Sequence, residues 1–517
     1  MSIMPKEVID YMAIKINSAT FTGVNGTIVD VEVDVTCGLP SFNIVGLADI
    51  SVKESKERVR SALINSGFQF PNSRITVNLA PGDLRKEGSL FDLPIAIAIL
   101  LATNQISTYN MKEYLLMGEL SLFGELKKVK GALPIVIDTV KHGIVKFIVP
   151  TENADECAVI DSAKIYAFDN LNQVINFLKY EDLQPYNISS KTIYNNFYED
   201  FSDVIGQESC KRSIEVAAAG GHNIIMFGPP GCGKTMIAKR VSTILPKLSY
   251  DEALEVTKIY SISGNLDSIK GLIKERPFRN PHHTSSQIAL VGGGNKLIPG
   301  EISLAHNGVL FLDEILEFSG KTLEVLRQPL EDRTIKISKA SGSVTYPANF
   351  MLIGAMNPCK CGFYGSNIKD CTCSDYDRNR YLNKLSRPIL DRIDVFTYVS
   401  SISYKELSVK SRKESSKDIR ERVERARNIQ KQRFHEEGIY CNAQMNEKHI
   451  KKYCRIDVKT NELIEKIYNQ YNLSTRSYSR ILKVARSIAD LRQSKKIGQE
   501  DLIEALQYRK FIGKDII

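Results

Sequence analysis

The chain has 517 residues, of which 43% are hydrophobic and 25% are charged, a composition typical of a soluble globular protein with several domains. The longest apolar run, Leu93 to Ala102, is too short to span a bilayer, and residues 1–7 lack the features of a secretory signal. The ten cysteines are too sparse for a disulfide scaffold. These features disfavour an integral membrane protein or a membrane partner and predict a cytoplasmic protein.

The positive charge is concentrated in the C-terminal part of the chain. The net charge is +9, and residues 401–517 contain 27 of the 69 Lys and Arg residues but 16 of the 60 Asp and Glu residues. A basic excess in one region fits a polyanionic partner such as nucleic acid. Solvated basic faces of helices would give the same count, so charge alone leaves both interpretations open.

Residues 1–180 are predicted to form an α/β domain of alternating strands and helices. Strands are expected at residues 21–35, 74–79, 114–120 and 145–150, and helices at 51–67 and 93–102. Residues 181–200 combine Pro185 with several polar residues and are interpreted as a linker.

Three stretches of this domain, residues 80–88, 118–124 and 148–153, are similar to the proteolytic domain of Lon-type proteases, which is related to a ribosomal-protein fold. In that family a serine acts together with a lysine. Here the serine position falls at about Leu90, beside Ser89, and the lysine position falls within residues 131–134, which contain no lysine. A serine without such a lysine is a poor nucleophile, so we expect an inactive protease-like domain.

The strongest motif is Gly228-Pro-Pro-Gly-Cys-Gly-Lys-Thr235, which lies between an apolar run at 223–227 and a helical pattern from Met236. Strand, glycine-rich loop and helix form the setting of a P-loop, whose backbone N–H groups surround phosphate. Lys234 would reach the β- and γ-phosphates of ATP, and Thr235 would hold Mg²⁺. The expected nucleotide-binding residues are Ile205, Gly228, Pro229, Pro230, Gly231, Cys232, Gly233, Lys234, Thr235 and Met236.

Residues 308–314, Gly-Val-Leu-Phe-Leu-Asp-Glu, predict a buried strand that ends in two carboxylates. Asp313 would orient the ligands of Mg²⁺, and Glu314 would polarise the attacking water. A second apolar strand at 349–357 ends in Asn357, whose amide could hold that water. The segment 201–207, which contains Ile205, resembles the entry segment of AAA+ ATPases, where it lines the adenine pocket.

Two segments are predicted to project from the ATPase core. Residues 276–307 form a loop-rich insertion with a glycine run and Lys296, and its adjacent histidines lack a third metal ligand at helical spacing. We expect these histidines to serve structure or substrate gating. Residues 334–347 have the pattern of a hairpin with Lys339 near its tip. A hairpin at this place lines the pore in chelatase-like and replicative-helicase AAA+ proteins, although a surface hairpin without a ligand is the alternative.

Four cysteines, Cys359, Cys361, Cys371 and Cys373, lie within fifteen residues. Four thiolates could form a tetrahedral Zn²⁺ site that orders the loop between them. The spacing is tighter than in common zinc ribbons, so buried thiols without a ligand and redox sensing are the alternatives.

The whole chain resembles the magnesium-chelatase-like family of AAA+ ATPases, in its ComM-type branch. The most diagnostic stretches are residues 276–283, residues 299–306 and the paired Cys-x-Cys motifs. The resemblance implies an arginine finger at Arg392, with Arg387 in reserve, that acts on the site of a neighbouring subunit. It also implies a second nucleotide sensor at Arg476, with Arg480 as the alternative.

The fold class expected from this resemblance is α/β, with an inactive Lon-protease-like domain at residues 1–180 and a three-layer AAA+ P-loop core at 201–400. An α-helical lid is expected at 401–517. The implied function is a hexameric motor that uses ATP and Mg²⁺ on single-stranded or branched DNA. Its implied role is branch migration of transformed DNA with recombination proteins, and Lys296 and Lys339 would line the pore. A metal-inserting chelatase subunit, a Lon-like peptidase and a scaffold that only holds ATP are the alternatives.

Overall fold

The computed structural model describes residues 13–108, 110–187, 199–266, 271–294, 297–339, 342–366, 369–402, 414–456, 458–471, 473–511 and 514–515. The chain divides into two compact units, Met1–Thr192 with Ala253–Ile273, and Ile193–Glu252 with Lys274–Ile517. Residues 253–273, which the sequence boundaries place inside the ATPase core, thus group with the N-terminal unit. The core and the C-terminal helices form one unit.

The N-terminal unit contains a seven-stranded mixed sheet in the order β3-β4-β2-β1-β5-β8-β9. The strands are β1 Ile14–Thr22, β2 Asn25–Thr36, β3 Ser41–Val45, β4 Arg74–Ala80, β5 Tyr114–Leu116, β8 Lys146–Pro150 and β9 Lys164–Phe168. The strand predicted at 21–35 corresponds to β2, whereas its first residues belong to the end of β1 and to a two-residue turn at Gly23, where φ is +59°. Valines alternate along β2 and bury one face of the sheet.

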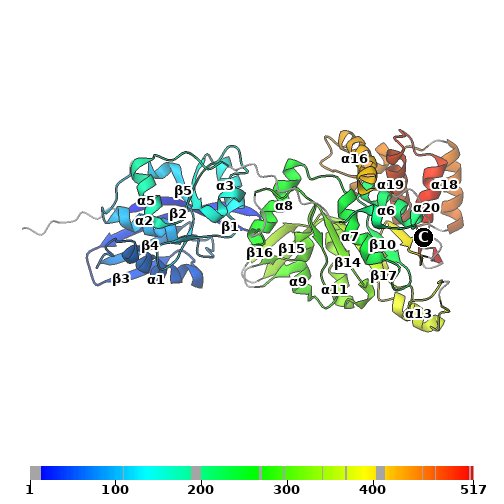
Figure 1. Ribbon diagram of the computed structural model, residues 1–517, viewed down its shortest axis with the longest axis horizontal. Coiled ribbons are helices and arrows are strands. Elements are labelled where there is room, and N and C mark those ends of the chain that lie inside the picture. Colours follow the sequence, from blue (N-terminus) through cyan, green and yellow to red (C-terminus); the bar gives the residue numbers. More distant parts are fainter. Residues whose placement is uncertain are drawn as a thin grey trace, which may run out of the picture. The chain divides into compact units, whose positions relative to one another are not determined.

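The helices of this unit are α1 Ile50–Asn65, α2 Asp92–Ala102, α3 Ala132–Lys141, α4 Thr151–Cys157 and α5 Leu171–Tyr180. Helix α2 is almost entirely apolar and lies against β1 and β2, with nearly every side chain buried (Figure 1). Its first residue, Asp92, is buried and accepts a hydrogen bond from Arg58 Nε at 2.6 Å. This ion pair links α1 to α2 beneath the surface of the unit.

The second unit contains a five-stranded parallel sheet in the order β11-β14-β17-β10-β18. Its strands are β10 Ile224–Phe227, β11 Phe278–Arg279, β14 Val309–Leu312, β17 Met351–Met356 and β18 Val395–Tyr398. The three central strands are apolar and fully buried, as expected for a parallel sheet that is covered on both faces. The carboxyl ends of β10, β14 and β17 therefore meet at one edge of the sheet.

The C-terminal helices pack on this unit rather than forming a separate one. They are α16 Ser416–Arg433, α17 Glu447–Tyr453, α18 Val458–Tyr471, α19 Thr475–Leu491 and α20 Gln499–Gln507. Helices α16 and α19 contact α6 Glu208–Gly220, and α16 also contacts α7 Lys234–Ile244 (Figure 1). Their apolar faces join the core of the sheet in one cluster.

Shorter elements connect the strands of the second unit. They are η2 Phe201–Asp203, α9 Gln287–Val291, α10 Glu301–Leu304, η3 Ile315–Glu317, α11 Gly320–Glu324, α12 Arg327–Asp332, β15 Thr334–Lys339, β16 Gly342–Pro347, α13 Asp375–Leu382, α14 Arg387–Leu390 and η4 Asn442–Gln444. Strands β15 and β16 form an antiparallel pair, in which Thr334 lies opposite Pro347 at one end and Lys339 lies opposite Gly342 at the other. This pairing confirms the predicted hairpin. Within the described ranges, no helix is both long and apolar enough to cross a bilayer.

Candidate nucleotide-binding site

The glycine-rich loop connects β10 to α7 at the carboxyl edge of the parallel sheet. Helix α7 begins at Lys234, directly after Gly233, whose φ is +90°, and Gly231 has a φ of +76°. Glycine suits both positions because a side chain strains this backbone region. Gly228 is needed for space, since a Cβ there would lie 2.2 Å from the Val399 carbonyl oxygen. The loop therefore has the strand, turn and helix setting that phosphate binding requires.

The Lys234 amino group lies in the centre of this loop. It donates hydrogen bonds to the carbonyl oxygens of Gly228 and Pro229 at 2.8 and 2.9 Å, and to Asn357 Oδ1 at 3.1 Å. Burial lowers the pKa of Lys234. Asn357 follows β17, the neighbour of β10, so the parallel register brings the two residues together. The amide and the lysine thus reach the same space beside the loop.

The two residues expected to hold Mg²⁺ are also neighbours. Thr235 Oγ1 donates a hydrogen bond of 2.7 Å to Asp313 Oδ2. A hydroxyl and a carboxylate at this separation fit the oxygen ligands that Mg²⁺ prefers, so these residues could hold the ion. Glu314 follows with a φ of +48°, and its side chain is 60% exposed. The Glu314 carboxylate therefore lies in the open, solvent-accessible part of the site.

The loop, the carboxylates and Asn357 line one cavity of about 200 Å³. Two further residues of this cavity, Glu317 and Tyr381, were missed from the sequence. Burial raises the pKa of Tyr381, and the nearby Glu317 raises it further. Neither residue belongs to a recognisable motif, because η3 and α13 bring them in by tertiary packing.

The segment that contains Ile205 lies near the same edge of the sheet. Gln207 Nε2 donates a hydrogen bond of 2.5 Å to the carbonyl of Ser400, which follows the carboxyl end of β18. Ile205 is half-buried there. Cys232 in the loop is buried, and Met236 in the first turn of α7 is 37% exposed. These positions agree with a nucleotide base above the loop, and the contacts to a nucleotide stay predictions.

Arg392 lies at the opposite edge of the sheet from the glycine-rich loop. Its carbonyl oxygen accepts a hydrogen bond of 3.1 Å from Asn223 Nδ2, and Asn223 precedes β10, whereas the loop follows it. The strand between them is ~13 Å long. The Arg392 guanidinium pairs with Glu331 and its side chain is 12% exposed, while Arg387 is exposed at the start of α14. Neither arginine is among the residues that line the cavity of its own loop.

Arg476 is likewise absent from this cavity. It is exposed in the first turn of α19, one turn before Arg480. Arg480 pairs with Asp394 at 2.5 Å, and Asp394 lies beside Asn223 at the amino edge of the sheet. Arg392 and Arg480 thus lie at the edge away from the loop of their own chain, and Arg476 does not line the cavity of that loop.

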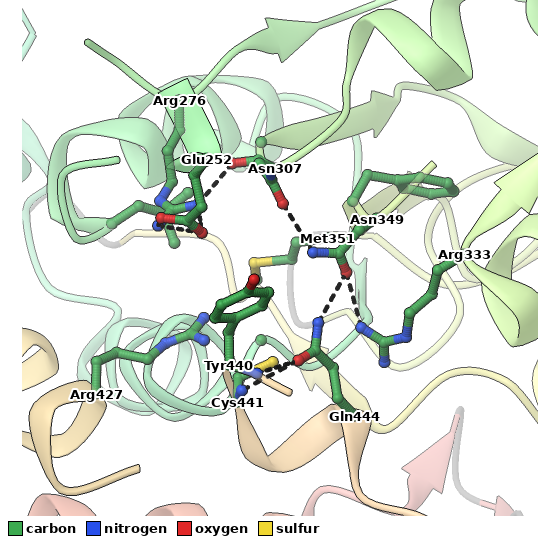
Figure 2. A pocket seen from close by; sticks show the side chains of 14 residues that line it. Glu252, Arg276, Asn307, Arg333, Asn349, Met351, Arg427, Tyr440, Cys441 and Gln444 are labelled. Carbon is green, nitrogen blue, oxygen red and sulfur yellow. Dashed lines mark hydrogen bonds and ion pairs between the residues drawn. The ribbon is translucent and has the colours of Figure 1, made fainter. Parts of the chain in front are cut away.

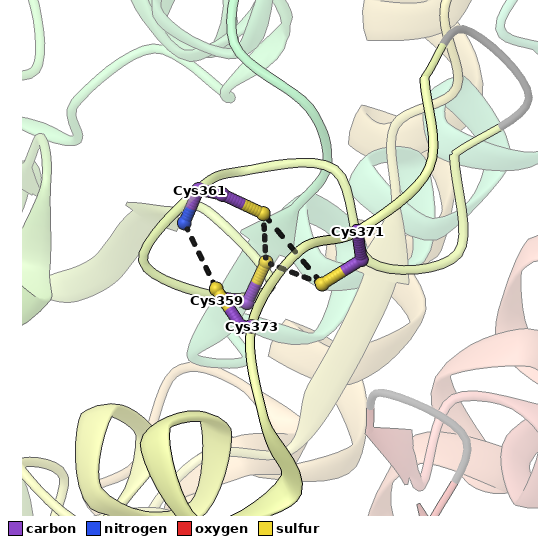
Figure 3. Close-up of side chains that lie close together, drawn as sticks. All are labelled: Cys359, Cys361, Cys371 and Cys373. Atoms are coloured by element: carbon purple, nitrogen blue, oxygen red, sulfur yellow. Dashed lines mark hydrogen bonds between the residues drawn. The ribbon is translucent and has the colours of Figure 1, made fainter.

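The four clustered cysteines converge in the loop before α13 (Figure 3). Their sulfur atoms all lie within 4.8 Å of one another, and the Cys359 Sγ atom is 3.3 Å from that of Cys361 and 3.6 Å from that of Cys371. Zinc bound at 2.3 Å by four thiolates requires sulfur atoms about 3.8 Å apart, so the arrangement fits the ion. The Cys361 N–H also points to Cys373 Sγ at 3.4 Å, a contact that would stabilise a thiolate.

In the N-terminal unit, Ser89 and Lys86, the lysine nearest to it in the sequence, form hydrogen bonds with different groups. Ser89 Oγ hydrogen-bonds to Glu119, and the buried Lys86 donates to the Pro81 carbonyl. Leu90, at the expected serine position, is 3% exposed. In the described part of the chain, no lysine hydrogen-bonds to Ser89, so the contact that would activate this serine is absent.

Of the two lysines expected in the pore, only Lys339 can be placed. Its amino group donates a hydrogen bond of 2.8 Å to the Gly294 carbonyl, which joins the hairpin to the glycine run. Lys296 lies outside the described residues. The rings of His282 and His283 are 4.1 Å apart, and His283 Nδ1 lies 4.0 Å from Glu314 Oε2, so this insertion approaches the carboxylate of the site.

Three family models match successive parts of the chain. They are described as magnesium chelatase, subunit ChlI, for residues 200–407, subunit ChlI of Mg-chelatase for residues 31–153, and magnesium chelatase, subunit ChlI C-terminal, for residues 413–509. The first of these contains the whole glycine-rich loop and its carboxylates.

Curated relatives match over nearly the full length. The chain is 43% identical to the uncharacterized protein YifB of Escherichia coli, over 94% of this chain and 95% of that protein. It is 42% identical to the competence protein ComM of Haemophilus influenzae, over 95% of this chain and 96% of that protein. Lon protease 2 of Bacillus subtilis is 29% identical over 30% of this chain and 32% of that protein. With full-length relatives at this identity and family models along its length, the chain belongs to the magnesium-chelatase ChlI family and is of the ComM type.

Proposed function

We propose that this protein is an ATP-hydrolysing motor that acts on DNA as a ring of identical subunits. The observation that carries the proposal is the convergence of Lys234, Thr235, Asp313, Glu314 and Asn357 on one cavity at the carboxyl edge of the sheet. The family assignment supports ATP and Mg²⁺ as the ligands of this cavity.

Each residue of the cavity has a distinct task in this proposal. Lys234 binds the phosphates, and Thr235 and Asp313 hold Mg²⁺, which neutralises charge that develops on the transferring phosphoryl group. Glu314 accepts a proton from the attacking water, and Asn357 orients that water. Because Glu314 is 60% exposed, closure of a neighbouring element over it would exclude bulk water from the site.

The positions of the arginines support an oligomer. Arg392 lies at the sheet edge opposite its own loop, and Arg476 does not line the cavity of that loop, so we infer that both contact nucleotide at the loop of another chain. A head-to-tail interface repeated around an axis generates a closed ring. We infer a homo-oligomer, with six subunits as the number that the family resemblance favours.

DNA is the polymer along which we propose that the motor moves. The β15–β16 hairpin presents Lys339 at its end, and a C-terminal basic excess suits a polyanion. The relative from Haemophilus influenzae is a competence protein, which fits a role in the branch migration of transformed DNA. The Cys359 cluster would hold a structural Zn²⁺ that orders the loop next to α13.

The test is steady-state ATP hydrolysis with and without branched DNA. We expect DNA to stimulate the wild type, Glu314→Gln to abolish turnover, and Lys339→Ala to remove the stimulation while basal hydrolysis persists. Lys336→Ala, on the same strand and also exposed, is the matched control and should keep the stimulation. If neither single-stranded nor branched DNA binds or changes the rate of ATP hydrolysis, the proposal that the motor acts on DNA is wrong.

The same family assignment supports one alternative, a subunit that uses ATP to insert metal into a porphyrin. Hydrolysis that is stimulated by a porphyrin and insensitive to DNA would favour it. A Lon-like peptidase would require Ser89, so casein cleavage that Ser89→Ala abolishes would support that activity. The partners of Ser89 and Lys86 argue against it.

A further inference from the structure

A small cavity lies at the amino edge of the parallel sheet, on the far side from the glycine-rich loop. It is formed by the segments that precede β10, β11, β14 and β17, by the residue before β15, and by α16 and η4. Figure 2 shows the side chains that line it. Three arginines from different parts of the chain line it, Arg276, Arg333 and Arg427. Nothing in the proposed ATPase cycle uses these three residues.

Arg276 forms a fixed and neutral part of the wall. Its two terminal nitrogens pair with Glu252 at 3.0 and 3.1 Å, and its Nε and Nη1 atoms donate to the carbonyls of Pro246 and Asn307 at 2.7 Å. All five of its N–H groups can therefore be satisfied within the protein. Glu252 is likewise committed to this pair.

Arg333 and Arg427 have no such compensation. Arg333 donates from Nη1 to Asn349 Oδ1 at 2.7 Å, and Arg427 donates from Nε and Nη2 to the Ala218 carbonyl at 3.3 and 3.0 Å. Among the described residues, neither guanidinium has a carboxylate within ion-pair distance. Two cations that face one cavity without a counter-charge are costly, because both lose part of their hydration.

The charges around the cavity add to this imbalance. Burial lowers the pKa of Arg276 and of Arg333. Glu252 opposes this shift at Arg276, Cys441 and Asp394 oppose it at Arg333, and the charge of Arg427 lowers both pKa values further. Burial also lowers the pKa of Lys483, on α19, to about 8, and Arg333 contributes in the same direction. The nearby carboxylate of Asp394 is already paired with Arg480. The region therefore has an excess of positive charge that an anion would relieve.

The walls of the cavity are polar and held in place. Asn349 Oδ1 accepts from both Arg333 and Gln444 Nε2, the latter at 3.2 Å, and Asn349 Nδ2 donates to Asn307 Oδ1 at 2.8 Å (Figure 2). The cavity has a volume of about 50 Å³, which is room for a few waters or one small oxyanion. Tyr440, which also lines it, is 53% exposed, so the cavity reaches the surface.

We propose that this cavity binds a phosphoryl oxyanion, with Arg333 and Arg427 as its ligands and the Arg276–Glu252 pair as a fixed wall. Guanidinium groups that approach from separate elements suit a tetrahedral anion, whose oxygens point in several directions, better than one planar carboxylate. The anion is either free phosphate or a phosphate of a nucleic-acid backbone. The site is separate from the glycine-rich loop, because the two lie at opposite ends of the strands of the sheet.

The test measures inorganic phosphate binding by ³¹P NMR titration of the full chain that carries Lys234→Ala, which disables the loop. We expect saturable binding of one phosphate per chain. Arg333→Gln and Arg427→Gln should each weaken it tenfold or more, since each removes a charge-assisted hydrogen bond. Arg427→Lys, which keeps the charge, should bind more tightly than Arg427→Gln.

Arg279→Gln is the matched control, because Arg279 is a partly buried arginine of the same unit whose guanidinium is fully paired with Glu301 at 2.7 Å. It should leave phosphate binding unchanged. Displacement of phosphate by a short single-stranded oligonucleotide would identify the backbone as the source, and binding that the oligonucleotide does not affect would identify free phosphate. Phosphate affinity that stays within twofold in Arg333→Gln and Arg427→Gln, or that falls equally in Arg279→Gln, would overturn the proposal.

Discussion

Replacement of Gly228 by alanine tests whether the first glycine of the loop is required for space rather than for backbone conformation. The added Cβ would lie 2.2 Å from the Val399 carbonyl oxygen and 3.1 Å from its carbon. An ordinary carbon–oxygen contact is about 3.3 Å, so the two backbones must separate by roughly 1 Å. The hydrogen bond from Val399 N to the Phe227 carbonyl, 2.9 Å long, resists this separation.

The displacement would reach Lys234 directly, because this lysine hydrogen-bonds to the Gly228 carbonyl. A misplacement of about 1 Å commonly costs ~100-fold in rate, and overpacking of a tight contact costs about 1–3 kcal/mol of stability. We therefore expect Gly228→Ala to lower kcat/KM for ATP by about 100-fold. The loss should also appear as weaker binding of a fluorescent ATP analogue.

Gly320→Ala is the matched control for this experiment. Gly320 opens α11 in the same unit, a Cβ there would meet nothing within 4 Å, and its φ is not positive. We expect this variant to hydrolyse ATP like the wild type. If Gly228→Ala retained kcat/KM and nucleotide affinity within threefold of the wild type, the contact with Val399 would not constrain the loop, and the argument from space would be wrong.

Three further predictions concern the metal, the arginines and the N-terminal unit. The purified chain should contain about one Zn²⁺ by elemental analysis, and Cys361→Ser should lose most of it; a metal-free wild type with four freely titrating thiols would rule out the zinc site. Arg392→Ala should lower kcat by roughly 1,000-fold with little change in nucleotide affinity, whereas equal losses of rate and affinity would contradict a role in trans. Asp92→Ala, measured by urea unfolding of the full chain, should destabilise the N-terminal unit by about 3–5 kcal/mol because it leaves the Arg58 guanidinium without its partner. Combined replacement of Arg58 and Asp92 by apolar residues should lower the free energy of unfolding by less than Asp92→Ala does. An equal loss would show that the ion pair itself stabilises the unit.

Features that depend on neighbouring residues could be predicted from the sequence. The pattern in 334–347 predicted the hairpin, and the apolar runs before Gly228, Asp313 and Asn357 predicted three strands, which the structure shows to be parallel. Lys234 and Asn357 are 123 residues apart, and they meet in the structure because the carboxyl ends of parallel strands share one edge. The double strand at 14–36 was missed because a two-residue turn interrupts the alternation very little.

Features that depend on how distant elements pack could not be obtained in this way. No sequence pattern indicated that residues 253–273 group with the N-terminal unit, or that α16 and α19 cover the amino edge of the sheet. Packing of α16 brings Arg427 to the cavity that Arg333 also lines, and the contact with Asn223 before β10 places Arg392 away from its own loop. The sequence by itself determined the nucleotide loop and its carboxylates, because their geometry follows from short, strongly constrained motifs. Only the tertiary structure decided where the arginines lie, because arginines on helices are positioned by the surfaces against which those helices pack, and those in connecting segments are positioned by contacts with distant residues.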